Sequence, residues 1–431
     1  MPSEPSAPSY PPNPTRTHRI SEIRPNVCVT LCGRLAELSD DGSGSLRDES
    51  GQLRVAFEAL PQDVSCGDIL EVQGTWRPPA FRAAKVRRLV PARSQSAEHA
   101  TELRRALELR ASVLAGVRSY FDGEGFLEVE TPLLLRCPGM EPHLTAFETT
   151  SREAGGPGRL YLPTSPEYAM KRLLSAGFER IYQVCKAFRD EPPAAMHNPE
   201  FTILEWYRAY ADYRAIMDEA ERMVHRIAIA AAGSPVVRFG QNAVDTTPPW
   251  DRITVHEAFQ RHAGITLGTE EDAADLVRQA KASGNRSVSD GDTYDVAFFK
   301  VFLDSIEPRL GCTRPTLLMD YPAGMAALSR IKQGSPHLAE RFEIYIAGVE
   351  LANGFTELND PDEQAARLEA ESRERRASSA EAYPIDDQFL EALRRGMPPS
   401  GGVALGLDRL VMLLAGEERV RDVLAFPYPE L

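Results

Sequence analysis

The chain has 431 residues, enough for two or three domains that each bury a hydrophobic core. Its formal net charge of −14 argues against a general polyanion-binding protein, although a local basic face remains open. There is no run of about 18 apolar residues and no apolar signal-peptide core, so we expect no membrane span. The six cysteines and eight histidines lack zinc-ligand or disulfide spacing, which is typical of reduced thiols in a cytoplasmic protein.

The first part of the chain divides into a tail and a candidate barrel. Residues 1–15 are rich in proline and serine and are predicted to be disordered. Residues 16–95 hold short strands between turn signals, which predicts a five-stranded barrel of the oligonucleotide-binding (OB) type. This barrel either binds RNA or serves stability or docking. Residues 18–93 hold 11 basic and 10 acidic side chains, a weak electrostatic footprint for RNA.

The remaining part, residues 100–431, starts with a helical pattern over 101–121 that leads into GFLEVETPLL at 125–134. Taken alone, this stretch is typical of a helix-to-strand turn in a core. Residues 164–173, TSPEYAMKRL, predict a loop entering a helix, with Ser165 and Pro166 at cap and first-turn positions. Glu167 then lies in the first turn, where it either stabilises the helix dipole or binds a ligand.

A long polar loop lies between two strand patterns within residues 181–213, IYQVCKAFRDEPPAAMHNPEFTILEWYRAYADY. Long loops inside compact domains are usually functional or disordered. Arg189 suits a phosphate, a carboxylate such as Glu191 can accept from an exocyclic amine, and Phe201 can stack on a base. The alternative is a solvated hairpin tip with surface ion pairs.

Two strand patterns near the C-terminus, residues 316–329 and 339–358, are predicted to pair. Glu350 and Glu357 are seven residues apart, so a regular strand would place them on opposite faces. Asn353-Gly354 signals a bend or bulge that would bring both carboxylates to one site, where they suit Mg²⁺ held with substrate phosphates. The alternative is two surface glutamates.

The last segment is rich in glycine and then helical. Gly402, Gly406 and the small Ala404 would permit a ligand to approach the backbone closely. Asp408 is expected to cap the helix, which places Arg409 near its positive end. Earlier, the patterns over 270–283 and 294–306 predict two acidic helices without evident chemistry.

Three of these stretches together resemble one family. FRDE followed by HNPEFTILEWY is similar to motif 2 of the class II aminoacyl-tRNA synthetases, in the lysyl form. GFLEVETPLL resembles their motif 1 and GGVALGLDRLVMLLAG, residues 401–416, resembles motif 3. The resemblance covers roughly residues 100–431 and, within the class, looks closest to the paralogues that ligate (R)-β-lysine onto elongation factor P. It implies an α+β fold, an antiparallel sheet flanked by helices, preceded here by the OB-type barrel.

The resemblance also implies roles for individual residues. Arg189 and Arg409 are the implied catalytic residues, and Glu350 and Glu357 the implied Mg²⁺ ligands. The implied ATP-binding residues are Arg189, Glu191, His197, Asn198, Phe201, Glu350, Leu351, Gly406 and Arg409. The implied amino-acid-binding residues are Ser165, Pro166, Glu167, Tyr207, Glu357 and Ala404. Asp190 departs from the asparagine usual in this motif and adds a negative charge near the phosphates.

The activity implied by the resemblance is ATP- and Mg²⁺-dependent conversion of lysine or (R)-β-lysine to an adenylate. Transfer to a lysine side chain of elongation factor P is the favoured second step, and charging of tRNA-Lys is the alternative. A regulatory paralogue without catalysis is a third reading. Motif 1 implies a homodimer with Pro132 at the contact. The barrel departs from the elongation factor P ligases as usually found.

Overall fold

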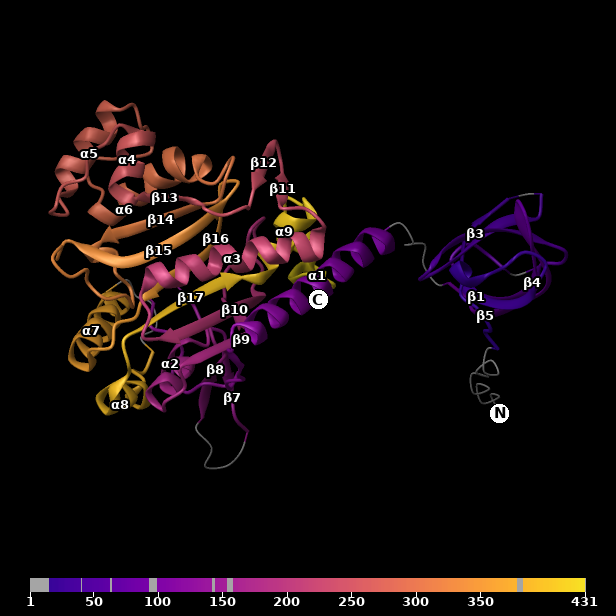
Figure 1. Cartoon of the computed structure of the whole chain (residues 1–431), viewed down its shortest axis with the longest axis horizontal. Helices are drawn as coiled ribbons and strands as arrows, with labels where there is room; N and C mark the ends of the chain where they lie inside the picture. Colours follow the sequence, from indigo (N-terminus) through magenta and orange to yellow (C-terminus); the bar gives the residue numbers. More distant parts are fainter. Residues whose placement is uncertain are drawn as a thin grey trace, which may run out of the picture. The chain divides into compact units, whose positions relative to one another are not determined.

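The computed structural model divides the chain into two compact units, residues 1–102 and 103–431, which are treated separately here (Figure 1). It describes residues 15–39, 41–62, 64–92, 99–141, 144–152, 158–377 and 383–430. The tail predicted to be disordered therefore lies outside the described residues, except for Thr15. None of the described helices is long and apolar enough to cross a membrane.

The first unit contains a closed five-stranded barrel, which confirms the OB-type prediction. Alternating strand positions point inward, so that Leu31, Leu46, Val55 and Leu70 build its core around the fully buried Phe81. A 3₁₀ turn, Ile20–Glu22, packs beside strand β3. The strands, paired in the order β1-β2-β3-β5-β4, are β1 (Cys28–Leu38), β2 (Ser43–Asp48), β3 (Gly51–Phe57), β4 (Ile69–Arg77) and β5 (Ala80–Val90).

An eight-stranded sheet organises the second unit. Its central strands are antiparallel as expected, but the two outer pairs, β13–β14 and β6–β9, are parallel, so the sheet is mixed. In spatial order the strands are β13 (Asp251–Thr254), β14 (Thr316–Pro322), β15 (Leu338–Ile346), β16 (Val349–Thr356), β17 (Ser400–Gly406), β10 (Glu200–Ala209), β9 (Arg180–Phe188) and β6 (Leu127–Glu128).

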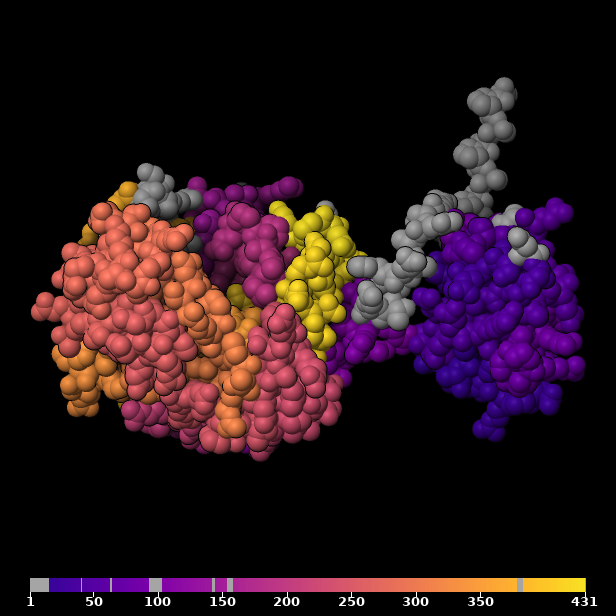
Figure 2. Space-filling model, turned by 90° about the horizontal axis from the view of Figure 1, so that it is seen from above, coloured from indigo at the N-terminus to yellow at the C-terminus, as the bar shows by residue number. Residues whose placement is uncertain are grey.

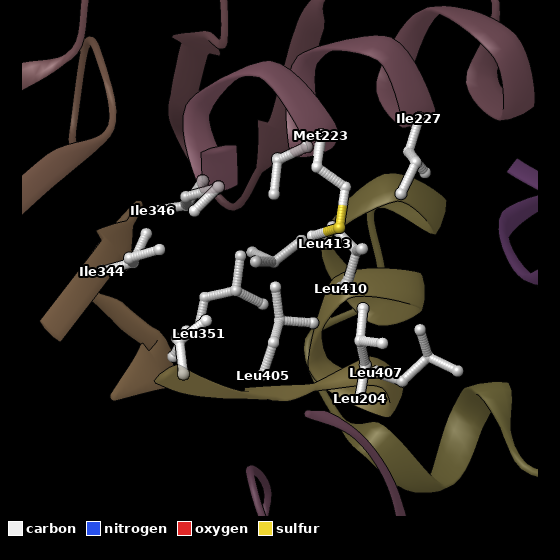
Figure 3. Packing of buried hydrophobic residues seen from close by; sticks show 14 of the residues in the cluster. Leu204, Met223, Ile227, Ile344, Ile346, Leu351, Leu405, Leu407, Leu410 and Leu413 are labelled. Carbon is white, nitrogen blue, oxygen red and sulfur yellow. The ribbon is translucent and has the colours of Figure 1, made fainter. Parts of the chain in front are cut away.

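One face of this sheet is sealed by a large apolar core. Figure 3 shows Leu351 and Leu405 from the sheet meeting Met223 from a long helix and Leu410 from the C-terminal helix. Burial of such side chains is the main favourable term in folding. The helices that contribute to this core are α1 (His99–Gly123), α3 (Tyr213–Ala232) and α9 (Leu407–Ala415).

A second helical layer covers part of the opposite face, near β9 and β10. Tyr207 of β10 packs there with Met170, Leu368 and Phe389. The helices of this layer are α2 (Glu167–Ser175), α7 (Pro361–Ala377) and α8 (Asp387–Gly396).

A separate helical cluster packs on β13 and β14 around Phe259 and Phe298. Figure 2 shows it, in salmon, as one continuous part of the surface of the second unit. Both predicted acidic helices are present, and the second continues into a π-helical turn, Phe302–Ile306, and a 3₁₀ turn, Glu307–Arg309. The helices are α4 (Val255–Ala263), α5 (Ala273–Ala282) and α6 (Tyr294–Val301).

Short elements complete the described chain. The two-stranded sheets are β7 (Glu148–Thr150) with β8 (Arg159–Tyr161) and β11 (Val236–Phe239) with β12 (Asn242–Asp245). The remaining 3₁₀ turns are Ala323–Met325, Val420–Val423 and Tyr428–Glu430.

A bulge in β16 brings Glu350 and Glu357 to the same face of the sheet. Ile344 pairs with Ala352 and Tyr345 pairs with Glu350, which leaves Leu351 as an extra residue. Leu351 and Ala352 both belong to the apolar core, so Glu350 points to the other face, as Glu357 does. The predicted irregularity exists, but it lies at Leu351 and not at Asn353-Gly354, where the strand pairing is regular.

Candidate active site

The predicted site residues gather on the sheet face opposite the apolar core. Strand β17 lies between β10 and β16, so residues of these three strands stand side by side. Ala404 pairs with Glu205 on one side and with Asn353 on the other. Gly402 pairs in the same way with Tyr207 and Phe355.

One end of this face presents arginines. The loop between β9 and β10 closes through a bond from the Arg189 backbone N–H to the Pro199 carbonyl, 2.9 Å. The Arg189 guanidinium carbon lies 5.1 Å from the centroid of the Phe201 ring, a cation–π contact. Among the described residues Nε of Arg189 has no hydrogen-bond partner. This guanidinium therefore has donor capacity for an anion.

Arg409 connects the loop to β16. Its Nε donates to the Met196 carbonyl at 3.2 Å, and its Nη1 donates to the Glu350 carbonyl at 2.7 Å. A longer contact of 3.4 Å joins Nη1 to the Glu350 carboxylate. Arg409 is thereby held near Arg189, at the start of helix α9.

Asp408 does not cap helix α9, contrary to the prediction. Its carboxylate accepts from Arg110 Nη2 at 2.5 Å and from the Thr202 backbone N–H at 2.8 Å. The N-cap position is Gly406, which has no side chain to make a capping bond. Asp408 instead joins helices α1 and α9 to strand β10, because a buried carboxylate needs these donors.

The other loop residues take different roles. His197 Nε2 lies 3.9 Å from Glu191 Oε2, and burial lowers the pKa of His197, which favours the neutral ring near two arginines. Asn198 is engaged with backbone: its Nδ2 donates to the Glu200 carbonyl at 2.6 Å, and its Oδ1 accepts from the Tyr428 N–H at 3.0 Å. Asn198 therefore fixes the loop, while Asp190 is exposed.

Glu350, which was predicted to hold Mg²⁺ together with Glu357, has a further carboxylate, Glu343, close to it. Burial and the neighbouring Glu343 carboxylate raise the pKa of Glu350, against the pull of Arg409 and Arg341. Glu343 is oriented by Arg341 Nη2 at 2.7 Å and by the Tyr345 hydroxyl at 2.6 Å. Glu357 follows the end of β16, seven residues after Glu350. No group of three or more His, Cys, Asp or Glu within the described ranges could hold a metal by itself.

The opposite end of the face is a carboxylate pocket. Ser165 donates its hydroxyl to Glu205 at 2.6 Å, and the Tyr207 hydroxyl donates to the same carboxylate at 3.0 Å. Burial, with the nearby Glu167 charge, raises the pKa of Glu205 to about 8, although these two hydrogen bonds act in the opposite direction. Burial likewise raises the pKa of Glu357 to about 7, against the opposing Lys171.

Gly402 and Gly406 differ in whether the space around them would admit a side chain. A Cβ on Gly402 would lie 2.3 Å from the Tyr207 ring and 2.5 Å from Glu357 Oε1, so this position must be glycine. A Cβ on Gly406 would meet only the Arg409 side chain, at an ordinary 3.5 Å. Leu351 is buried in the core (Figure 3), so only its backbone is available to a ligand.

The sequence analysis missed several residues of this face, namely Glu141, Lys171, Glu205, Glu343 and Asn353. Pro166, which was expected to contact the amino acid, occupies the N-cap position of α2 and has no backbone N–H to donate. Glu205 was detectable, because on a regular strand it lies on the same face as Tyr207, but a buried glutamate and an exposed one look alike in a sequence. Glu343 depends on the register of the β15–β16 hairpin, which the sequence does not specify.

Comparison with known proteins agrees with this architecture. The family model for class II tRNA synthetases (D, K and N) matches residues 92–430. The lysine–tRNA ligase of Moorella thermoacetica is 41% identical over 332 residues, which are 76% of this chain and 65% of that protein. For the lysine–tRNA ligase of Pelotomaculum thermopropionicum the identity is 38% over 330 residues, 76% of this chain and 64% of that protein.

A longer alignment joins the chain to the lysine–tRNA ligase of a Nostoc species, 33% identical over 419 residues, 95% of this chain and 72% of that protein. The match to the first two relatives thus spans slightly less than two thirds of their own length. The family model covers most of the chain, including the loop arginines, the carboxylate pocket and the glycine-rich strand. The chain therefore belongs to the class II tRNA synthetases of the D, K and N group.

Proposed function

We propose that the protein uses ATP to activate a diamino acid, lysine or (R)-β-lysine, as its adenylate. The observation that carries this proposal is the arrangement of one sheet face, with Arg189 and Arg409 at one end and a carboxylate pocket at the other. The pocket carboxylates, Glu167, Glu205 and Glu357, suit the two ammonium groups of a diamino acid. The relatives are named lysine–tRNA ligases, which supports lysine or a lysine-like amino acid as the substrate.

The chemistry requires charge control rather than a general base. The carboxylate of the amino acid is already ionised near pH 7 and must approach an anionic phosphate. Arg189 is positioned to offset that repulsion, and preorganised charges of this kind are the main source of rate. We expect the adenine to stack between Phe201 and Arg409, with Glu191 available to its amine, and the Arg189 guanidinium already lies over the Phe201 ring.

Magnesium fits the carboxylates at the arginine end. Glu343 and Glu350 would hold it together with substrate phosphates, as Mg²⁺ usually combines one or two carboxylates with phosphate oxygens. When bound, the ion neutralises phosphate charge. Glu357 is expected to bind a substrate ammonium, because it lies in the carboxylate pocket beside Lys171.

The proposed acceptor is a lysine side chain of elongation factor P. Two features of the barrel support a protein acceptor over RNA. Among the described barrel residues, Phe81 is buried, and Phe57 and Trp76 pack against the core and are only partly exposed. The barrel also has balanced charge. RNA binding commonly needs stacking rings and excess positive charge.

Transfer to tRNA-Lys is the second candidate. The closed OB-type barrel and the names of the relatives favour it. A purely regulatory role has less support, because Arg189, Glu350 and Arg409 are all in place. In either case the six free cysteines fit a cytoplasmic location.

We also propose a homodimer through residues 125–134. Leu127, Leu133 and Leu134 expose 52%, 41% and 57% of their area, and Pro132 is exposed beside them. Strand β6 is the edge of the large sheet, so its apolar residues and unpaired backbone are both available to a second copy.

The first test is amino-acid-dependent pyrophosphate exchange with α-lysine and (R)-β-lysine. Arg189→Ala is expected to lower kcat/KM by about 10²–10³-fold, as loss of one preorganised donor at developing charge does elsewhere. Arg104→Ala, which removes an exposed arginine paired only with Glu108, serves as the control and should leave exchange unchanged. Equal exchange by all three proteins would remove Arg189 from its role.

The second test concerns pH. The side-chain ammonium of lysine needs an ionised carboxylate partner, and it keeps its own proton up to about pH 10. Since the pKa of Glu205 is about 8 and that of Glu357 about 7, KM for the amino acid should fall as pH rises from 6.5 to 8.5. Glu205→Gln should flatten the upper half of this profile. Identical profiles for wild type and variant would contradict the assignment.

The third test measures mass in solution. Light scattering should give twice the chain mass of 47.6 kDa. Leu134→Glu is expected to shift the protein toward monomer, because it buries a charge in the proposed interface. Leu303→Glu is the matched control, at a residue 54% exposed on another surface. A wild-type monomer at micromolar concentration would refute the dimer.

The fourth test addresses the two lysines. Ala404 stands between Glu205 and Asn353, and its methyl group would crowd an amine on the α-carbon, which a β-amino acid avoids. Wild type should therefore prefer (R)-β-lysine, and Ala404→Gly should narrow the preference by about 10–200-fold, the usual effect of one methyl in a pocket. A wild-type preference for α-lysine, unchanged by the substitution, would favour the tRNA-Lys reading.

A further inference from the structure

Lys171 is a fully buried cation within the carboxylate pocket. It lies on α2, one turn after Glu167, and its side chain has no exposed area. Its Nζ is 2.6 Å from Glu167 Oε1 and 2.6 Å from Glu357 Oε2. Burial alone lowers the pKa of Lys171, but the two carboxylates outweigh this effect and raise it, so the ammonium stays charged.

The contacts of Lys171 leave other oxygens of the pocket without donors. Oε1 of Glu357 has no hydrogen-bond partner among the described residues, and it lies next to the Gly402 backbone at the floor of the pocket. Oε2 of Glu141 is likewise unpaired. Two carboxylates, Glu167 and Glu357, thus contact the resident cation, and Glu141 lies near enough to be influenced by its charge. Buried carboxylate oxygens of this kind call for positively charged donors.

We propose that Lys171 is a positioning residue that sets the selectivity of the pocket for a diamino acid. It holds one oxygen of Glu167 and one of Glu357, and so directs their remaining oxygens toward the substrate ammonium groups. This proposal rests on the function proposed above and extends it. Lys171 was not among the residues expected to contact the substrate, and the proposal gives it the role of orienting two of them.

The physical reason is the short distance between the two carboxylates. Both contact one ammonium nitrogen, so the contacting oxygens lie within about 5 Å of each other, and buried like charges at such a distance share a proton unless a cation separates them. Without Lys171 the pocket would hold one ionised carboxylate fewer. It would then lose more affinity for a ligand with two ammonium groups than for a ligand with one.

A purely structural role predicts a different result. If Lys171 only tied α2 to the sheet, its loss would loosen the pocket and weaken diamino and monoamino ligands alike. The ratio of their affinities therefore separates the two roles, whereas stability does not.

The experiment measures calorimetric binding of α-lysine, (R)-β-lysine and norleucine, which lacks the side-chain ammonium, to wild type and to Lys171→Met. Wild type should bind at least one diamino acid more tightly than norleucine. In Lys171→Met this affinity ratio should fall at least about tenfold, in line with the loss of a charge-assisted contact. An unchanged ratio, or a wild type without preference for diamino acids, would overturn the proposal.

Lys332→Met is the matched control. Lys332 Nζ contacts Asp320 Oδ2 at 2.6 Å in another largely buried pair, outside the pocket, so its loss should lower stability and leave the ratio unchanged. If Lys171→Met does not fold, Lys171→Gln removes the charge but retains a donor, and the same fall in the ratio is expected. An unchanged ratio in that variant would also overturn the proposal.

Calorimetric binding does not require catalysis. The proposal about Lys171 and the proposal about amino-acid activation can therefore be refuted independently. Absence of pyrophosphate exchange with both lysines would refute activation, while the binding ratio would still decide the role of Lys171.

Discussion

The pairing of β17 between β10 and β16 is the constraint on which the site depends. It places Glu205, Ala404 and Asn353 in one row across the sheet and Tyr207, Gly402 and Phe355 in the next. The Tyr207 ring and a Glu357 oxygen occupy the space that a Cβ at Gly402 would need. Because the reverse face is sealed by the apolar core, the polar groups of these strands have only one side on which to meet.

The polar face presents two different sets of charged groups along the sheet, and Glu343 and Glu350 lie with the arginines. Arg189 and Arg409 stand at one end and the carboxylates around Lys171 at the other. Each end has polar atoms without hydrogen-bond partners in the described part of the chain, namely Nε of Arg189 at one end and Oε1 of Glu357 at the other. A substrate that carries an anionic group at one end and ammonium groups at the other would complete both, at a cost in stability that the free protein bears.

Much of the fold followed from the sequence. Regular turn spacing predicted the barrel, and the two strand patterns around Arg189 predicted the hairpin that carries the loop. The odd separation of Glu350 and Glu357 required an irregular strand, and the bulge exists. Its position at Leu351 was not predictable, since Asn353-Gly354 is the stronger local signal and tertiary packing of Leu351 decided otherwise.

Parts of the site could not be predicted from the sequence, and the reason is physical. Glu343 becomes a neighbour of Glu350 only through the hairpin register, and in the sequence Lys171 cannot be told from the adjacent basic residue Arg172 of the same amphipathic helix. Asp408 stands where a cap is expected, but its carboxylate accepts hydrogen bonds from Arg110 and from the Thr202 backbone instead. Each case depends on a contact between residues far apart in the chain.

Under the proposed function, activation and choice of acceptor are separable in this architecture. Every side chain assigned to the site belongs to the unit spanning residues 103–431, and the barrel has its own closed sheet and its own core. Family membership therefore bears more directly on the proposed activation than on the proposed transfer. The proposed acceptor would be selected by surfaces outside the sheet face, and a barrel whose described rings are buried or only partly exposed offers little stacking surface to a single-stranded RNA.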